Sequence, residues 1–171
     1  MKGRAALTLR DGAAVDVRPL ERSDRAELAA AVGRLSAETR YLRFAAAKPR
    51  LTERELDHLT DLDHHGREAL LAIDPRTRNG VAVVRYVEVP GEPDVVEVAA
   101  TVTDEWQGRG LGGALLARLA ERAADEGYAA LRASVLANNG RSLAMLRRAG
   151  FTFRSADGPL HEYERPLRPR Y

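Results

Sequence analysis

A glycine-rich turn, Gln107-Gly108-Arg109-Gly110-Leu111-Gly112-Gly113, constrains the fold of this chain more than any other feature. The run 95–102 before it is nearly continuous in valine and alanine, which indicates a strand buried on both faces in the middle of a sheet. After the turn, leucine and alanine recur at helical spacing until Gly127, which ends the predicted helix. The segment is therefore expected to form a strand, a tight turn and an amphipathic helix.

Such a turn is suited to binding an anion. The first N–H groups of a helix have no partner within it, and the helix dipole places partial positive charge there. Glycines let the backbone approach a phosphate, and Arg109 adds a full charge. A Walker A loop does not fit, because Gly113-Ala114 follows Gly112, and the alternating glycines do not fit a dinucleotide fingerprint. A glycine-rich helix start without a ligand remains the alternative.

The rest of the chain alternates turns with apolar runs. Asp11-Gly12 predicts a β-hairpin, and helices are expected after Asp24, Ser36 and Thr52, where Thr52 and Glu55 form a capping box. The other expected elements are strands at 69–73, 81–89 and 95–102, a turn at 90–93, a strand at 128–136, a helix after Asn139, and strands at 151–154 and 160–167. This order predicts an α/β domain of mixed, α+β type, mostly antiparallel in its first half and βαβ-like in its second.

Composition narrows the possible functions. The 171 residues suit a single domain, 1–171, and the lack of cysteine excludes thiol nucleophiles and cysteine-based zinc sites. The net charge is only +2 and the arginines are scattered among acids, so no nucleic-acid partner is expected. No apolar run reaches the roughly 18–20 residues of a membrane helix, and no secretory signal is recognisable. A cytoplasmic protein without a membrane partner, monomeric or homodimeric, is the expectation.

Two motifs resemble those of the GNAT acyltransferase superfamily. The stretch from Gln107 to Gly112 fits its Q/R-x-x-G-x-G/A signature, and Asn139 stands eleven residues before Gly150-Phe151, as in its second signature. The similarity runs from about Val15 to Leu167. It implies the GNAT fold, a mostly antiparallel central sheet splayed in the middle and flanked by helices. The segments 40–44, 51–56 and 63–65 also resemble the acyltransferase domain of bacterial protein-lysine acetyltransferases.

The resemblance implies acetyl-CoA as cosubstrate and no metal. The acetyl group would move directly to a primary amine, on a protein lysine or a small molecule. The turn amides would hold the pyrophosphate, the strand ending at Val102 would pair with the pantetheine, and an N–H near Val102 would face the thioester carbonyl. The residues implied in cofactor binding are Ala100, Val102, Gln107, Gly108, Arg109, Gly110, Leu111, Gly112, Gly113, Asn139 and Ser142. For Asn139, simple helix capping is the alternative.

Glu97 is the predicted catalytic base. It is the only charged residue within 95–102, and a carboxylate in an apolar strand is costly unless it is paired or functional. The acceptor begins as an ammonium with a pKa of about 10, so a group must remove its proton. The alternative is a glutamate at the surface or paired with an arginine. Acceptor specificity is expected from the helical stretch 23–60.

One position departs from the family pattern. Leu146 stands where many GNAT enzymes have a tyrosine that protonates the leaving thiolate, and leucine cannot donate a proton. The thiolate could be protonated by water or by another residue, or it could leave without being protonated. The sequence does not show whether Tyr128 or Tyr163 lies near the site. His58, His64 and His65 are interpreted as surface or loop residues, and His161 is a weaker candidate for the substrate cleft. A non-catalytic acyl-CoA-binding sensor module remains the main alternative function, ahead of a nucleic-acid-binding domain.

Overall fold

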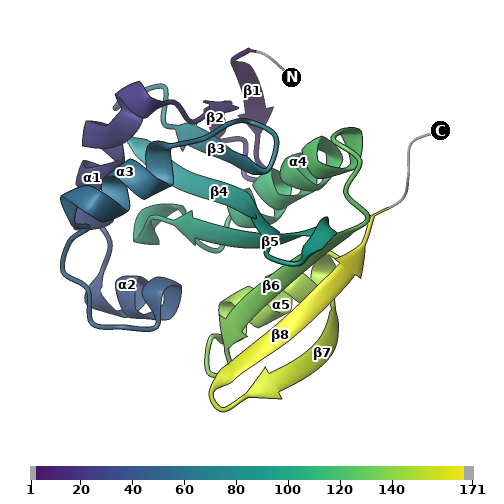
Figure 1. Ribbon diagram of the computed structural model, residues 1–171. Coiled ribbons are helices and arrows are strands. Elements are labelled where there is room, and N and C mark those ends of the chain that lie inside the picture. Colours follow the sequence, from purple (N-terminus) through teal and green to yellow (C-terminus); the bar gives the residue numbers. More distant parts are fainter. Residues whose placement is uncertain (1–2, 168–171) are drawn as a thin grey trace.

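The computed structural model describes residues 3–167, which build one eight-stranded sheet with helices on both faces (Figure 1). The strand order is β1-β2-β3-β4-β5-β6-β8-β7. Every neighbouring pair of strands is antiparallel except β5 and β6. The mixed, mostly antiparallel fold predicted from the sequence is confirmed, and the parallel pair connected by α4 is the predicted βαβ unit.

The strands are β1 (Ala5–Thr8), β2 (Ala14–Pro19), β3 (Arg67–Ile73), β4 (Gly80–Val89), β5 (Glu92–Val102), β6 (Ala130–Leu136), β7 (Thr152–Asp157) and β8 (Leu160–Pro166). The helices are α1 (Arg25–Gly33), α2 (Ala37–Phe44), α3 (Glu53–Thr60), α4 (Leu111–Asp125) and α5 (Gly140–Arg148), with short 3₁₀ turns η1 (Arg22–Asp24) and η2 (Asp104–Trp106). Within the described range, no helix is long and apolar enough to cross a membrane.

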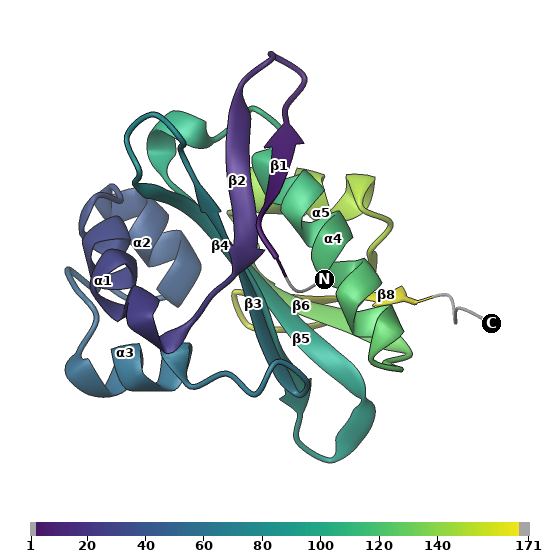
Figure 2. The same cartoon turned by 90° about the horizontal axis from the view of Figure 1, so that it is seen from above.

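The helices form two layers, one on each side of the sheet (Figure 2). On one side lie α1, α2 and α3, which begin where the sequence predicted: Ser36 caps α2, and Thr52 with Glu55 forms the capping box of α3. Their apolar side chains form a separate cluster of Leu28, Val32, Leu35, Leu51 and Leu56. This layer therefore has its own small core, distinct from the main one.

The other layer consists of α4 and α5 (Figure 2). The leucines of α4 lie on one face of the helix and enter the main core, which is built with Val96 and Val98 of β5 and Leu146 of α5. Gly127, with a φ of 95°, follows the end of α4 as predicted. The long helix after the glycine turn is thus fixed on the sheet by buried leucines.

The sheet splays between β5 and β6. Their parallel pairing covers only three positions and ends at Glu97, opposite Arg132. Beyond this point β5 continues beside β4 as far as Val102, whereas β6 continues beside β8. The predicted burial of 95–102 on both faces is wrong: only Val96 and Val98 are buried, whereas Val95, Glu97 and 99–102 are half-buried, and no strand covers the edge of 99–102. The strand also begins earlier than predicted, at Glu92, which shortens the turn before it.

Candidate functional site

The start of α4 presents a row of unused backbone donors. Gly108 and Gly110 have φ values of 72° and 83°, a conformation that favours glycine, and Gly110 is the N-cap of α4 with no side chain capping it. The N–H groups from Gly108 to Gly113 donate no hydrogen bond to any group outside the helix within residues 3–167. With the dipole of a 15-residue helix behind them, these amides can receive an anion.

Two other residues of the turn serve packing. A Cβ atom on Gly112 would lie 3.0 Å from the sulfur of Met145 and 3.5 Å from a methyl of Val102. Gly112 therefore lets α4 approach α5 and β5 closely. Leu111 is 1% exposed and belongs to the core, so only its backbone N–H faces the predicted anion site.

Gln107 connects the turn to its surroundings. Its amide nitrogen donates to the carbonyl of Val102 (2.9 Å) and to the hydroxyl of Thr39 in α2 (3.2 Å). Its carbonyl oxygen accepts a hydrogen bond from Arg141, in the first turn of α5. Arg141 was not predicted from the sequence to contact the turn, although its position two residues after Asn139 places it at the start of the same helix. The Gln107 side chain is thus engaged by protein groups, and it holds the turn in place.

Arg109 is held at the turn by two contacts. Its Nε donates to Oδ2 of Asp11 in the β1–β2 turn (2.6 Å), and its guanidinium lies 4.3 Å from the centre of the Trp106 ring. The hydrogen bond from Arg109 keeps the pKa of the Asp11 carboxyl below its usual range. The predicted positive charge is present, but Asp11 partly neutralises it.

The edge of β5 exposed by the splay offers a second set of backbone groups. Thr103 donates its N–H to Val81 of β4, so by alternation Ala100 and Val102 direct theirs to the opposite side, from which β6 has diverged. The Val102 carbonyl accepts from Gln107, whereas the N–H groups of Ala100 and Val102 face the gap. An extended ligand chain can pair with this edge as an added strand does.

Asn139 and Ser142 form the N-terminal cap of α5. Asn139 Oδ1 accepts a hydrogen bond from the Ser142 N–H (3.2 Å), which establishes the capping role. The Ser142 hydroxyl makes no hydrogen bond to the rest of the described chain. Both side chains are half-buried.

Glu97 lies at the point where the two strands separate. Val96 and Val98 enter the core beneath α4, so Glu97 points to the opposite face, toward the α1–α3 layer. Its Oε1 accepts a hydrogen bond from Ser134 of β6 at 2.8 Å, a contact that sequence reasoning missed because the βαβ pattern does not specify which residues of the two strands lie opposite each other. In residues 3–167 no cation lies within salt-bridge distance of its carboxylate. Glu97 is half-buried and forms no salt bridge with an arginine, although the Arg43 guanidinium is near enough to interact with it electrostatically.

None of the tyrosines considered from sequence is placed to act with Glu97. Leu146 is 2% exposed and is a core residue. The Tyr128 hydroxyl donates to Glu88 at the far end of β4, and Tyr163 is buried opposite Ala133, on the α5 side of the sheet. Neither Tyr128 nor Tyr163 is therefore positioned as the proton donor that the sequence analysis considered.

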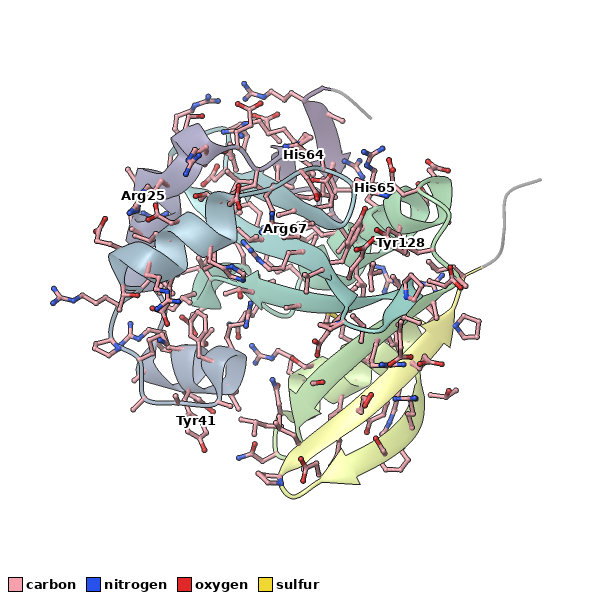
Figure 3. The ribbon with its side chains drawn as sticks, viewed as in Figure 1. Arg25, Tyr41, His64, His65, Arg67 and Tyr128 are labelled. Carbon is pink, nitrogen blue, oxygen red and sulfur yellow. The ribbon has the colours of Figure 1, made fainter. Side chains whose placement is uncertain are left out.

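The histidines lie away from Glu97. His64 contacts Glu68 and His65 contacts Glu126, both beside Tyr128, whereas Tyr41 of α2 is at the opposite end of the molecule (Figure 3). His64 and His65 form a network near the end of α4, and His58 is exposed on α3, in agreement with the interpretation as surface or loop residues.

His161 is not in the cleft beside Glu97. It pairs with Val135, whereas Ser134, which contacts Glu97, pairs with Glu162. His161 therefore faces the other side of the sheet, where it lines a hollow with Phe153 and Tyr163. The suggestion from sequence that it lines the substrate cleft is not supported.

This geometry agrees with what comparisons show. The profile of the acetyltransferase (GNAT) domain matches residues 15–152. The chain belongs to the GNAT acetyltransferase family. The resemblance read from the two motifs is thereby confirmed.

Two curated relatives of the GNAT chain carry the word acetyltransferase in their names. One, from Pseudomonas aeruginosa, is 33% identical over 124 residues, which are 71% of this chain and 66% of that protein. Acetyltransferase Pat of Mycolicibacterium smegmatis is 30% identical over 115 residues, which are 67% of this chain and 34% of that protein. The chain thus spans a little under two thirds of the first relative and about one third of the second.

Solved structures give the same fold. The GNAT domain of S. lividans PAT superposes with a TM-score of 0.90 at 33% identity, covering 96% of this chain and 97% of that domain. A cAMP-binding acyltransferase from Mycobacterium smegmatis gives 0.68 at 23% identity, with 98% and 48% covered. A phosphinothricin acetyltransferase from Sinorhizobium meliloti in complex with AcCoA gives 0.73 at 18%, with 90% and 88% covered. The latter two show the fold alone.

Proposed function

We propose that this GNAT protein is an acetyl-CoA-dependent N-acetyltransferase that transfers the acetyl group directly to a primary amine. The observation that carries the proposal is the junction of three features at the splay: the unused amides at the start of α4, the open edge of β5, and a carboxylate that forms no salt bridge within residues 3–167. The acceptor is a lysine of a protein or a small amine, as the family resemblance implies.

The backbone is proposed to hold the cosubstrate. The amides from Gly108 to Gly113 would take the pyrophosphate, and Ala100 and Val102 would pair with the pantetheine through the edge that β6 leaves open. An N–H of this edge facing the thioester carbonyl would stabilise the developing oxyanion, an effect worth roughly 3–4 kcal/mol per donor. Asn139 and Ser142, at the start of α5, are proposed to line the same channel.

Glu97 is proposed to accept the proton, directly or through a water molecule. The amine nitrogen attacks the carbonyl carbon, the C–N bond forms, the C–S bond breaks, and the proton of the amine passes to the carboxylate. Ser134 fixes the direction of that carboxylate through its hydrogen bond. The CoA thiol has a pKa of about 8.5, low enough to leave as thiolate, which is consistent with a leucine at position 146.

The test is release of free CoA from acetyl-CoA in the presence of a panel of primary amines: lysine-bearing proteins, polyamines, amino acids and aminoglycosides. At least one class should accelerate release, with the acetyl group recovered on nitrogen by mass spectrometry. Tight binding of acetyl-CoA without turnover on any amine, in the wild type as in Glu97→Gln, would instead identify a non-catalytic acyl-CoA sensor.

A further inference from the structure

Two arginines line the cleft beneath the α1–α3 layer without a carboxylate partner. Arg43 lies in the last turn of α2 and Arg85 on β4, and neither has an acidic group within 4.0 Å in the part of the chain that the structure describes. Eleven of the 21 other arginines within residues 3–167 form salt bridges, as Arg18 does with Asp24, and Arg43 and Arg85 differ from the unpaired exposed ones in being half-buried. The cleft is small, with a cavity volume of about 40 Å³.

The surroundings of the pair are mostly apolar. Arg85 donates one hydrogen bond, to the carbonyl of Leu59 (3.1 Å), and the Arg43 guanidinium lies 5.0 Å from the centre of the Phe44 ring. Burial lowers the pKa of Arg85 to about 10, and the neighbouring Arg43 adds to this. Burial also lowers the pKa of Arg43, against the opposing effect of Glu97. A half-buried cation without a counter-ion is costly unless a ligand supplies the charge.

The arginines are close to the proposed catalytic base. Arg85 pairs with Ala99 across the β4–β5 ladder, and Glu97 is the next residue of β5 on the same face. Diagonal neighbours of this kind lie roughly 7–8 Å apart, within reach of a long side chain. Ala99 and Thr101, which pair with Arg85 and Val83 of β4, carry small side chains that leave room in the cleft. Two cations therefore stand beside one carboxylate, which leaves one positive charge without a partner.

We propose that Arg43 and Arg85 bind a carboxylate of the substrate, so that the acceptor is an amine whose own molecule carries a carboxylate a few bonds from the nitrogen. The inference rests on the proposed function of the site. Guanidinium groups suit this task, because their donors match the two oxygens of a carboxylate. The pair shares a face with Glu97, and Glu97 receives the acceptor's proton. The second possible source of the same chemical group is a dicarboxylic acyl chain on CoA.

The test compares matched acceptors with acetyl-CoA as donor. The acceptors are a series of ω-amino acids of increasing chain length, from glycine to 6-aminohexanoate. Each acid is compared with its own primary amide, which lacks the negative charge of the carboxylate and keeps its shape. At the best chain length we expect kcat/KM about tenfold or more higher for the acid than for the amide, mainly through KM. Arg85→Gln and Arg43→Gln should bring the ratio close to one. Arg154→Gln, an exposed arginine on β7, should leave the ratio unchanged.

A second comparison identifies the source of the carboxylate. Succinyl-CoA and acetyl-CoA are compared as donors with one amine that carries no carboxylate. A preference for succinyl-CoA that Arg43→Gln removes would support the carboxylate site but assign the carboxylate to the acyl chain. If neither acid nor succinyl donor is preferred, or if a preference survives both arginine substitutions, the inference is wrong. Should Arg85→Gln fail to fold for lack of its bond to Leu59, Arg43→Gln carries the test, because that guanidinium makes no hydrogen bond within residues 3–167.

The carboxylate site can be tested even if the proposed acetyl transfer is not observed. If no amine is acetylated at all, calorimetric titration of glutarate, a dicarboxylate without an amine, still tests the pair. Binding to the wild type that is lost in Arg43→Gln supports the carboxylate site, and absence of binding to the wild type overturns it.

Discussion

The two sides of the splayed sheet are built by different means. On the α4–α5 side the site consists of backbone groups, the amides of 108–113 and the open edge of β5. On the α1–α3 side it consists of side chains, with Glu97 from β5, Ser134 from β6, Arg85 from β4 and Arg43 from α2. A backbone site binds a part common to every acyl-CoA, whereas a site of side chains can change with the acceptor. We therefore propose that the first side fixes the donor and the second selects the acceptor.

The largest effect is expected on the backbone side. In Gly110→Asp a carboxylate would stand at the N-cap of α4, where the site needs an anion from the ligand, and acetyl-CoA affinity should fall by about 100-fold or more. Calorimetry with CoA measures the loss. The fold should survive, because no atom lies within 4 Å of an added Cβ, although the positive φ adds some strain.

A matched control exists at the other end of the same helix. Gly127 also has a positive φ and open space around it, so Gly127→Asp imposes similar strain far from the turn. CoA affinity should stay near the wild-type value. Equal losses in both variants would mean that Gly110→Asp acts through the fold, and that the turn does not bind the diphosphate.

The next largest effect is expected for Glu97, where a substitution should change turnover without changing CoA affinity. Glu97→Gln removes the proposed base and keeps the shape, so kcat should fall about 10²- to 10³-fold while CoA affinity changes by no more than about twofold. Stopped assays across pH give the rate, and calorimetry the affinity. Glu88→Gln serves as control, because Glu88 pairs with Val96 and contacts Tyr128 on the face of the sheet opposite to Glu97. Turnover in Glu97→Gln equal to that of the wild type across pH would remove Glu97 from the mechanism.

The backbone side was largely predictable from sequence, because local signals specify it. A β-branched run, a glycine turn and a leucine-patterned helix each leave a short-range pattern, and Asn139 before Gly140 marks the start of α5. The same patterns predicted the element order. What they did not predict is the exact extent of the splay, which depends on where β6 leaves β5 for β8, a choice made by long-range pairing.

The side-chain side was predictable only in part. Glu97 was noticeable as a lone charge in an apolar strand, but Ser134 and Arg85 sit in ordinary strand sequence. They become neighbours of Glu97 only through the β4–β5 register and the hydrogen bond across the splay. Arg109 shows the reverse case: its charge was predicted, yet its partner Asp11 is 98 positions away in sequence. Contacts between distant segments leave no mark that a single sequence displays.

A smaller effect tests how Glu97 is held. Ser134→Ala removes the 2.8 Å hydrogen bond to the carboxylate, and kcat should fall by about three- to tenfold, with acceptor KM and CoA affinity little changed. Ser134→Thr, which keeps the hydroxyl, should recover most of the rate. A shift of the pH profile of kcat in the alanine variant that the threonine variant reverses would mark Ser134 as a positioning residue. Equal rates in all three proteins would show that Glu97 needs no such support.

The smallest effect is expected outside both sides, at the end of α4. His65 is hydrogen-bonded to Glu126 at 2.6 Å, which raises the His65 pKa above its ordinary value. The protonated form is therefore favoured by folding, so this contact stabilises the protein fully below a pH of about 6.5 and is lost as the pH rises through the folded-state pKa. Melting temperatures between pH 5.5 and 8.5 should fall slightly more in the wild type than in His65→Gln, and less so at high salt. Acetyl transfer at a fixed pH should be the same in both proteins; a change in acceptor preference would connect this end of α4 to the site and weaken the division into two sides.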